Sequence, residues 1–247
     1  MRKLLLILFA FQLFACKGQT YEVLGVESGF NGTPITFTGK TAIFVGDSYF
    51  AAPWCTGSVT IPSYFATATG STATNLGISG QVLQDEVAAC SPARTVFNET
   101  TVATYVEGTH SAVFIALGTN DVGVNNGLMT PSGYQATLEA AIDYIHNTRG
   151  WPLKRIIVIT SYYTLQAGRD LYVGDCGVVV AANSTRLTDY VDAAIAASVS
   201  RGTNLLNMYQ IQVDTGNPNS LMAGDGLHPN AGGADFIATS LNTTFYL

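Results

Sequence analysis

Short apolar runs that end in glycine or polar residues recur along this chain, and segments with helical spacing separate them. The first run, Ala42–Val45, is followed at once by Gly46. A continuous apolar run of this length is typical of a strand buried on both faces of a parallel sheet. Four later runs have the same character and are predicted as strands: 73–76, 112–117, 156–160 and 204–208.

Helical patterns lie between these runs. Residues 131–147 place apolar side chains on one face, with Thr130 as the expected N-cap and Pro131 at the first helical position. Residues 183–201 predict a second long helix, and 81–89 and 232–241 predict shorter ones. The expected buried face of the second helix consists of Leu187, Val191, Ala194, Ile195 and Val199.

Alternation of strands and helices indicates βαβ units and a parallel sheet. We therefore predict a single α/β domain over residues 41–247: a three-layer α/β/α sandwich of flavodoxin-like type, with a five-stranded parallel sheet.

The N-terminus has the pattern of an export signal. Residues 1–16 combine a basic start with a short apolar core and a small residue before Cys16. Residues 13–16 also resemble a bacterial lipobox, which predicts lipidation of Cys16; the alternative is ordinary cleavage around residues 19–20. We expect export to the bacterial cell envelope or beyond it, with the polar, Gly-rich residues 17–40 as a tether.

Composition excludes several classes of protein. Only 11% of residues are charged, about half of the typical fraction, and the net charge is −6. The 11 basic residues are scattered, which argues against a nucleic-acid-binding patch. Beyond the N-terminus no apolar run approaches the roughly 20 residues that span a bilayer, so we expect membrane contact only through the lipid anchor.

Three further cysteines remain after Cys16: Cys55, Cys90 and Cys176. Export permits disulfides, so we expect one pair and one free thiol, and the sequence does not choose the pair. The spacings match no zinc site. We predict a structural role for these cysteines.

Polar turns follow several of the predicted strands, and ligand sites in such folds lie at the carboxyl ends of the strands. The turns supply a hydroxyl (Ser48), a carboxamide (Asn120), and a histidine three residues after a carboxylate (Asp225 and His228). At that spacing the carboxylate can accept the imidazole Nδ1 proton. Jointly these are the groups of nucleophilic acyl transfer.

The sequence resembles the SGNH hydrolases of the GDSL esterase/lipase superfamily over roughly residues 41–245. The four blocks of that family are matched in order by Gly46-Asp47-Ser48, Gly80, Gly118-x-Asn120-Asp121 and Asp225-x-x-His228. Gly77 competes with Gly80 for the second block. The residue after Ser48 is Tyr49, where the family's older name has leucine.

The resemblance implies a role for each matched residue. Ser48 is the expected nucleophile, His228 its base, and Asp225 the group that orients the imidazole. The expected oxyanion hole consists of the Ser48 and Gly80 N–H groups and the Asn120 side chain. No cofactor and no metal are expected, and Asp47 and Asp121 are assigned to turn and network hydrogen bonds.

One alternative uses metal chemistry. A phosphoesterase-like metal site would draw its ligands from Asp47, Asp121, Asp225 and His228. This ligand set gives Ser48 and Asn120 no role in the reaction, so we favour the serine mechanism. His110 and His146 lie away from the predicted site and are expected to pack or to face solvent.

The predicted function is hydrolysis of carboxylic esters on a small molecule or a glycan, with O-acetyl groups on glycans favoured. The reasons are the predicted export, the absence of a long apolar lid helix, and polar, aromatic-rich segments at 49–54, 118–130 and 162–182 that we expect to shape the pocket. The alternatives are a lipase, lysophospholipase or thioesterase of the same family, or a carbohydrate-binding module that has lost turnover.

Overall fold

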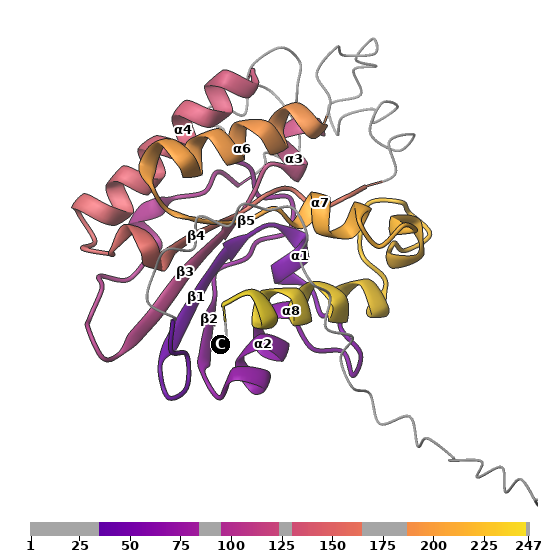
Figure 1. Ribbon diagram of the computed structural model, residues 1–247, viewed down its shortest axis with the longest axis horizontal. Helices are drawn as coiled ribbons and strands as arrows, with labels where there is room; N and C mark the ends of the chain where they lie inside the picture. The colour runs from indigo at the N-terminus through magenta and orange to yellow at the C-terminus, as the bar shows by residue number, and fades with distance from the viewer. Residues whose placement is uncertain (1–34, 84–94, 124–129, 165–186, 246–247) are drawn as a thin grey trace, which may run out of the picture.

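The computed structural model describes residues 35–83, 95–123, 130–164 and 187–245. Within them, five parallel strands form one sheet in the order β2-β1-β3-β4-β5 (Figure 1). This is the strand order of flavodoxin-like, doubly wound sheets, so the predicted fold class is confirmed. The strands are β1 (Thr41–Gly46), β2 (Thr72–Asn75), β3 (His110–Ala116), β4 (Ile156–Ile159) and β5 (Asn204–Leu206).

The sheet separates two apolar cores, as the continuous apolar runs predict. In β1, Ala42 and Phe44 belong to the core on one face, whereas Ile43 and Val45 belong to the core on the other. Successive side chains of a strand point to opposite faces, so both faces must be covered. The edge strand β2 differs from its prediction: it is largely exposed rather than buried.

Helices cover both faces. Helices α2 (Ile61–Thr69) and α8 (Ala231–Phe245) pack together on one side, and α4 (Pro131–Asn147) and α6 (Leu187–Arg201) pack together on the other (Figure 1). The short helices α1 (Ser48–Ala51), α3 (Thr119–Gly123) and α7 (Met208–Val213) each follow a strand. Single 3₁₀ turns lie at Glu99–Thr101, Leu153–Arg155 and Pro218–Leu221.

Side-chain caps fix the starts of the two helices that begin with proline in their first turn. The Thr130 hydroxyl accepts a hydrogen bond from the Gly133 N–H at 3.1 Å, which is the predicted cap of α4. Thr60 caps α2 in the same way, through the Ser63 N–H at 3.2 Å. Each cap satisfies a backbone donor that the helix itself leaves without a partner.

Three sequence predictions about elements need correction. In α6, Val199 is 72% exposed rather than buried. The predicted strand 204–208 ends at Leu206, and Met208 instead begins α7. Gln81, Val82 and Leu83, the described part of the predicted helix 81–89, are not helical, and Val82 forms an isolated parallel bridge with Val96. Residues 84–89 lie outside the described part.

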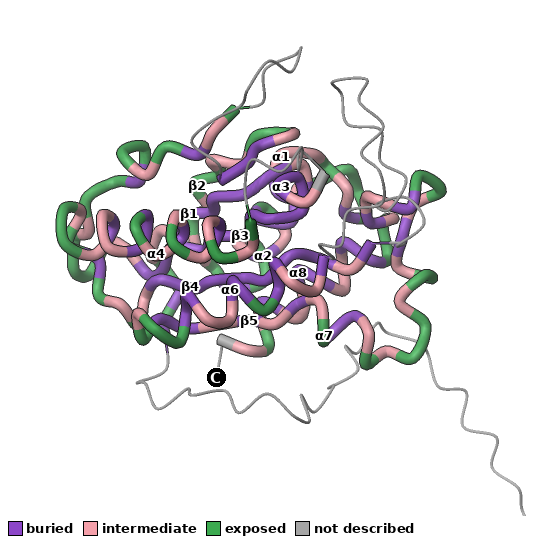
Figure 2. The backbone as a smooth tube through the Cα atoms, turned by 90° about the horizontal axis from the view of Figure 1, so that it is seen from above, coloured by how far each residue is buried: buried purple, intermediate pink, exposed green. Residues whose placement is uncertain are grey.

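The apolar core begins before residue 41. Ile35 and Phe37 are buried in the same cluster as Phe44, and Phe37 contacts the Phe65 ring edge-on, with centroids 5.0 Å apart. The last residues of the predicted tether therefore pack against the sheet. Figure 2 shows β1, β3 and β4 as buried strands inside the molecule, with exposed segments at its periphery.

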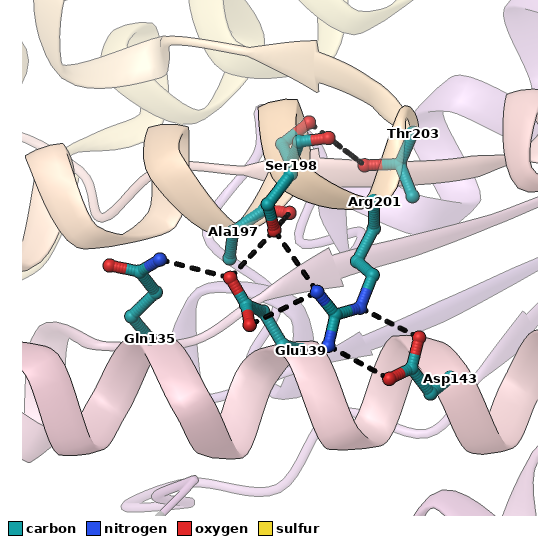
Figure 3. Close-up of polar contacts among 8 residues, drawn as sticks. Gln135, Glu139, Asp143, Ala197, Ser198, Arg201 and Thr203 are labelled. Atoms are coloured by element: carbon teal, nitrogen blue, oxygen red, sulfur yellow. Dashed lines mark hydrogen bonds and ion pairs between the residues drawn. The ribbon is translucent and has the colours of Figure 1, made fainter.

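An ionic cluster connects α4 and α6 (Figure 3). The Arg201 guanidinium donates to both carboxylate oxygens of Asp143, at 2.7 and 2.9 Å, and lies 3.1 Å from Glu139. Ser200 and Gln135 donate to the same Glu139 carboxylate. Hydrogen bonds from Gln135 and Ser200, assisted by Arg201, hold the pKa of Glu139 below its ordinary value.

In the described part of the chain, no helix has both the length and the apolar character needed to cross a membrane.

Candidate active site

Ser48 lies at the carboxyl end of β1, as the first residue of α1. The preceding Asp47 caps this helix, because its Oδ1 accepts the Tyr49 N–H at 3.0 Å. Gly46 permits the tight turn between strand and helix, since a Cβ there would lie 2.6 Å from the Phe50 ring. The strand, the cap and the turn therefore fix the Ser48 hydroxyl at the edge of the sheet.

His228 lies in the loop that leads into α8, and Asn230 holds this loop together. The Asn230 amide nitrogen donates to the carbonyls of Ser220 and Met222, at 2.8 and 3.1 Å. Its carbonyl oxygen accepts the Gly233 N–H at 2.9 Å, in the first turn of α8. These contacts tie the loop on both sides of His228 to the start of the helix.

The loop brings the predicted catalytic residues together. Ser48 Oγ lies 3.0 Å from His228 Nε2, and His228 Nδ1 lies 2.6 Å from Asp225 Oδ2. Asp225 Oδ1 also accepts the N–H groups of Leu227 and His228, each at 3.0 Å. The chain of contacts runs from hydroxyl to imidazole to carboxylate, and its second contact is the one that the spacing of Asp225 and His228 predicts.

Two opposing effects act on the Asp225 carboxyl group. Partial burial raises its pKa, but the hydrogen bonds from the His228 side chain and from the His228 and Leu227 N–H groups outweigh burial. The pKa of Asp225 is therefore below its ordinary value, and the group is a carboxylate at neutral pH. The His228 side chain is 21% exposed and that of Asp225 50% exposed, so the site opens to solvent.

Two aromatic residues of the Ser48 segment contact the His228 loop. The Tyr49 hydroxyl donates to the Leu227 carbonyl at 2.5 Å. The Trp54 indole N–H donates to the Ser48 carbonyl at 2.7 Å, and its ring stacks on His228 with centroids 4.7 Å apart. The sequence places both residues near the pocket, but it contains no local signal for contacts that span more than 170 positions of the chain.

Both glycines that compete for the second block have structural reasons to be glycine. Gly80 has φ of +76°, a left-handed conformation that residues with a Cβ rarely adopt. Gly77 packs against α1, and a Cβ there would lie 2.8 Å from Phe50 and 2.9 Å from the Ala51 nitrogen. Gly77 is thus a packing residue, whereas Gly80 shapes the turn of the expected oxyanion hole.

Asn120, in α3, is buried beside the site. Its amide nitrogen donates to the Gln81 carbonyl at 3.1 Å and faces Asp47 Oδ2 at 3.4 Å. The second contact is longer than the usual 2.7–3.2 Å of an N–H···O bond. Gln81, which the sequence does not single out, thus connects the third block to the turn after β2.

Asp47 and Asp121 are buried carboxylates that make backbone contacts, as predicted. Asp121 Oδ1 accepts the Leu83 N–H at 2.9 Å. Burial raises the pKa of the Tyr134 and Tyr162 hydroxyls, and nearby negative charge adds to the shift, from both aspartates at Tyr134 and from Asp47 at Tyr162. The two aspartates support the loops beside Ser48.

The other candidate residues lie elsewhere. Among the residues that the structure describes, no three His, Cys, Asp or Glu side chains form a metal-binding cluster, so the alternative ligand set is not assembled. His110 Nδ1 accepts the Val106 N–H, and His146 Nδ1 lies 2.8 Å from the Trp151 carbonyl oxygen. Both histidines therefore have packing roles.

Cys55 is a free, buried thiol. Burial, with a contribution from Asp235, raises the pKa of this thiol to about 12. Cys90 and Cys176 lie outside the described residues, as do Cys16 and most of segment 162–182.

A family model described as the GDSL-like lipase/acylhydrolase family matches residues 44–236. The chain belongs to this family and is an ester-hydrolysing enzyme. The predicted membership is thereby confirmed. No curated protein shows a significant sequence match to the chain.

Solved structures share the fold at low sequence identity. A lipase/acylhydrolase from Enterococcus faecalis is 17% identical, with a TM-score of 0.57, covering 83% of this chain and 94% of its own. An acetylxylan esterase from Geobacillus stearothermophilus is also 17% identical, with a TM-score of 0.54 and coverages of 86% and 96%. An α/β hydrolase from the metagenome of Lake Arreo, Spain, is 19% identical, with a TM-score of 0.55 and coverages of 85% and 96%.

Proposed function

We propose that this enzyme is an exported serine esterase in which Ser48, His228 and Asp225 form the catalytic triad. The observation that carries the proposal is the unbroken chain of contacts of 3.0 and 2.6 Å through the His228 ring. A serine hydroxyl becomes a competent nucleophile when a positioned base accepts its proton as it attacks. The lowered pKa of Asp225 keeps a carboxylate beside the imidazole.

In the first half of the reaction, Ser48 Oγ attacks the ester carbonyl carbon and its proton passes to His228 Nε2. Asp225 then faces an imidazolium, which its negative charge stabilises. The tetrahedral intermediate collapses when the bond to the alcohol oxygen breaks and His228 returns the proton to that oxygen. The products are a free alcohol and an acyl group on Ser48.

In the second half of the reaction, a water molecule takes the place of the released alcohol. His228 accepts a proton from the water, whose oxygen attacks the acyl carbonyl carbon, and a second tetrahedral intermediate forms. Its collapse breaks the bond to Ser48 Oγ, and His228 returns the proton to this oxygen. The carboxylic acid leaves and the enzyme is restored.

Three donors are proposed for the oxyanion: the Ser48 N–H, the Gly80 N–H and the Asn120 amide. The Ser48 N–H lies at the first position of α1, where a helix offers no acceptor. For Asn120 to reach the oxyanion, its amide must exchange one present contact. The 3.4 Å approach to Asp47 is the weaker of the two. Loss of one such donor typically costs roughly 2.7–4 kcal/mol of transition-state stabilisation.

For the substrate we propose O-acetyl groups on glycans. The fold carries acetylxylan esterase activity in the Geobacillus neighbour, and the site here is half-open to solvent. Export and lipidation at Cys16 belong to the same proposal. Replacement of Cys16 by serine is expected to abolish lipid labelling; unchanged labelling contradicts the anchor.

The decisive experiment combines a fluorophosphonate probe with a panel of p-nitrophenyl esters. Wild type is expected to be labelled and to prefer acetate, whereas Ser48→Ala loses both labelling and turnover. Ser63→Ala, at an exposed position of α2, is the matched control and retains both. Equal labelling of Ser48→Ala overturns the nucleophile assignment, and a preference for octanoate overturns the acetyl substrate.

A further inference from the structure

Trp54 contacts both members of the proposed catalytic pair. Its indole ring lies against the His228 ring with a centroid distance of 4.7 Å and an interplanar angle of 21°. Its Nε1–H donates to the Ser48 carbonyl oxygen at 2.7 Å. A single side chain therefore connects the backbone of the nucleophile to the face of its base.

The hydrogen bonds of His228 do not by themselves fix its ring. The contacts at Nε2 and Nδ1 act at the edge of the ring, so neither packs against a face of the ring to resist its tilting out of its plane. A contact on the face of the ring removes this tilt. Trp54 supplies that contact, and tilt decides whether the Nε2 lone pair points at the Ser48 hydroxyl.

Trp54 is itself held from two sides. The hydrogen bond to Ser48 fixes the indole to the end of β1. On the other side, the Thr56 N–H and hydroxyl donate to Asp235 of α8, at 3.1 and 2.6 Å. Between these anchors, Cys55 is buried in the core. The indole is thus attached both to the Ser48 segment and to the helix that follows the His228 loop.

We propose that Trp54 is a positioning residue that sets the plane of the His228 imidazole relative to Ser48. This inference rests on the proposed serine mechanism. The contact strengthens during the reaction, because the proton that leaves Ser48 Oγ gives His228 a positive charge, and an aromatic face attracts a cation. An interaction that grows in the transition state raises kcat more than it lowers KM.

The kinetic test compares three proteins on p-nitrophenyl acetate. Trp54→Leu keeps an apolar side chain but loses the aromatic face, and kcat is expected to fall about 10- to 100-fold with KM within about twofold. Trp54→Phe restores a ring face without the Nε1–H, so it is expected to recover part of the loss. Urea unfolding of each variant shows whether the fold is intact.

A spectroscopic test detects the stack without turnover. The chain has two tryptophans, and Trp151→Phe leaves Trp54 as the sole indole and removes the ring that lies near His110. A protonated imidazole quenches indole emission. Emission of this variant is expected to be weaker at pH 5 than at pH 8. Addition of His228→Asn removes this difference.

The results separate the possible roles of Trp54. A raised KM with unchanged kcat identifies Trp54 as a substrate contact and overturns the proposal, as does wild-type kinetics in Trp54→Leu. An emission difference that survives His228→Asn also overturns it. If wild type hydrolyses no ester, the proposed function fails. The pH dependence of Trp54 emission, with and without His228, then still decides whether Trp54 contacts the His228 ring. If Trp54→Leu does not fold, Trp54→Phe and the emission decide.

Discussion

The hydroxyl of Tyr49 donates a hydrogen bond of 2.5 Å to the carbonyl oxygen of Leu227, the residue before His228. The leucine of the family's older name has no donor at this position. The Tyr49 ring also stacks on Tyr162, with centroids 3.9 Å apart. The residue next to the proposed nucleophile therefore anchors the loop that carries the proposed base.

Removal of this hydroxyl is expected to affect stability and activity together. Tyr49→Phe loses one partly buried hydrogen bond, worth about 0.5–1.5 kcal/mol of unfolding free energy, and leaves the Leu227 carbonyl without this donor. We expect kcat to fall by up to about tenfold, because His228 loses part of its support. Urea unfolding and initial rates on p-nitrophenyl acetate measure both effects.

Tyr144→Phe is the matched control, since Tyr144 lies near the C-terminal end of α4, outside the segments expected to shape the pocket. It is expected to leave kcat unchanged. Equal kinetics in wild type and Tyr49→Phe would show that the loop is held adequately without the hydroxyl.

Asp225 makes stability depend on pH in a definite direction. Its pKa is lowered in the folded protein, so its carboxylate contributes stability above the unfolded-state value of about 3.9. That contribution is lost as the pH falls through the lowered folded-state pKa. Asp225→Asn is therefore expected to be less stable than wild type at neutral pH, with a smaller difference at about pH 3.

Activity provides the second readout for this position. In serine proteases, loss of the orienting carboxylate costs about 10⁴-fold in kcat, and we expect a loss of at least about 10³-fold in Asp225→Asn. Asp214→Asn, which replaces an exposed carboxylate, is the control. A stability difference that stays constant with pH contradicts the assigned role of Asp225 in folding.

Gly118 is predicted to tolerate no side chain. Its φ is +113°, and a Cβ would lie 2.6 Å from Ser161 Oγ and 2.9 Å from the Tyr134 hydroxyl. We expect Gly118→Ala to lower the unfolding free energy by about 2 kcal/mol or more, through backbone strain combined with overpacking. Thermal or urea unfolding measures this loss.

Substitution of Gly108 is a control that separates backbone strain from overpacking. Its φ is +82°, but no atom lies within 4 Å of the position that a Cβ would take, so Gly108→Ala reports backbone strain alone, about 1–2 kcal/mol. An equal loss in both variants means that the neighbours of Gly118 move aside without cost.

The ionic cluster between α4 and α6 is expected to stabilise the protein in a salt-dependent way. Arg201→Gln removes the positive charge that Asp143 and Glu139 share. We expect this variant to have a lower Tm than wild type at low ionic strength, and a smaller decrease at high salt. Because the pKa of Glu139 is lowered in the fold, its contribution is present above its ordinary pKa and disappears in acid. The control is Lys154→Gln, because Lys154 is exposed and no ion pair is found for it within the described residues. An equal decrease of Tm in this variant contradicts a role for the cluster.

The sequence predicts best what depends on local spacing. The cap at Thr130, the alternation of strands and helices and the contact between Asp225 and His228 all follow from residues that are neighbours in the chain. Three of the four blocks follow β1, β2 and β3, whose carboxyl ends meet at one edge of the parallel sheet, so their convergence could also be expected; the fourth block lies in the loop before α8. Their roles in catalysis await the experiments above.

Other features depend on packing between distant segments. The exposed Val199 shows this, because α6 packs through Tyr190, Ala193 and Ala197. Small residues let helices approach closely, so Ala193 and Ala197 are buried while the larger Val199 is exposed. The contacts of Tyr49 and Trp54 join segments far apart in the chain, and no periodicity in the sequence encodes them.

The separation of Ser48 from His228 has a consequence for biogenesis. Synthesis proceeds from the N-terminus, and His228 follows all five strands. If Ser48 and His228 act as proposed, a chain that has formed only the sheet has a serine without its base. On that proposal, ester hydrolysis begins only when the loop before α8 has brought His228 to Ser48.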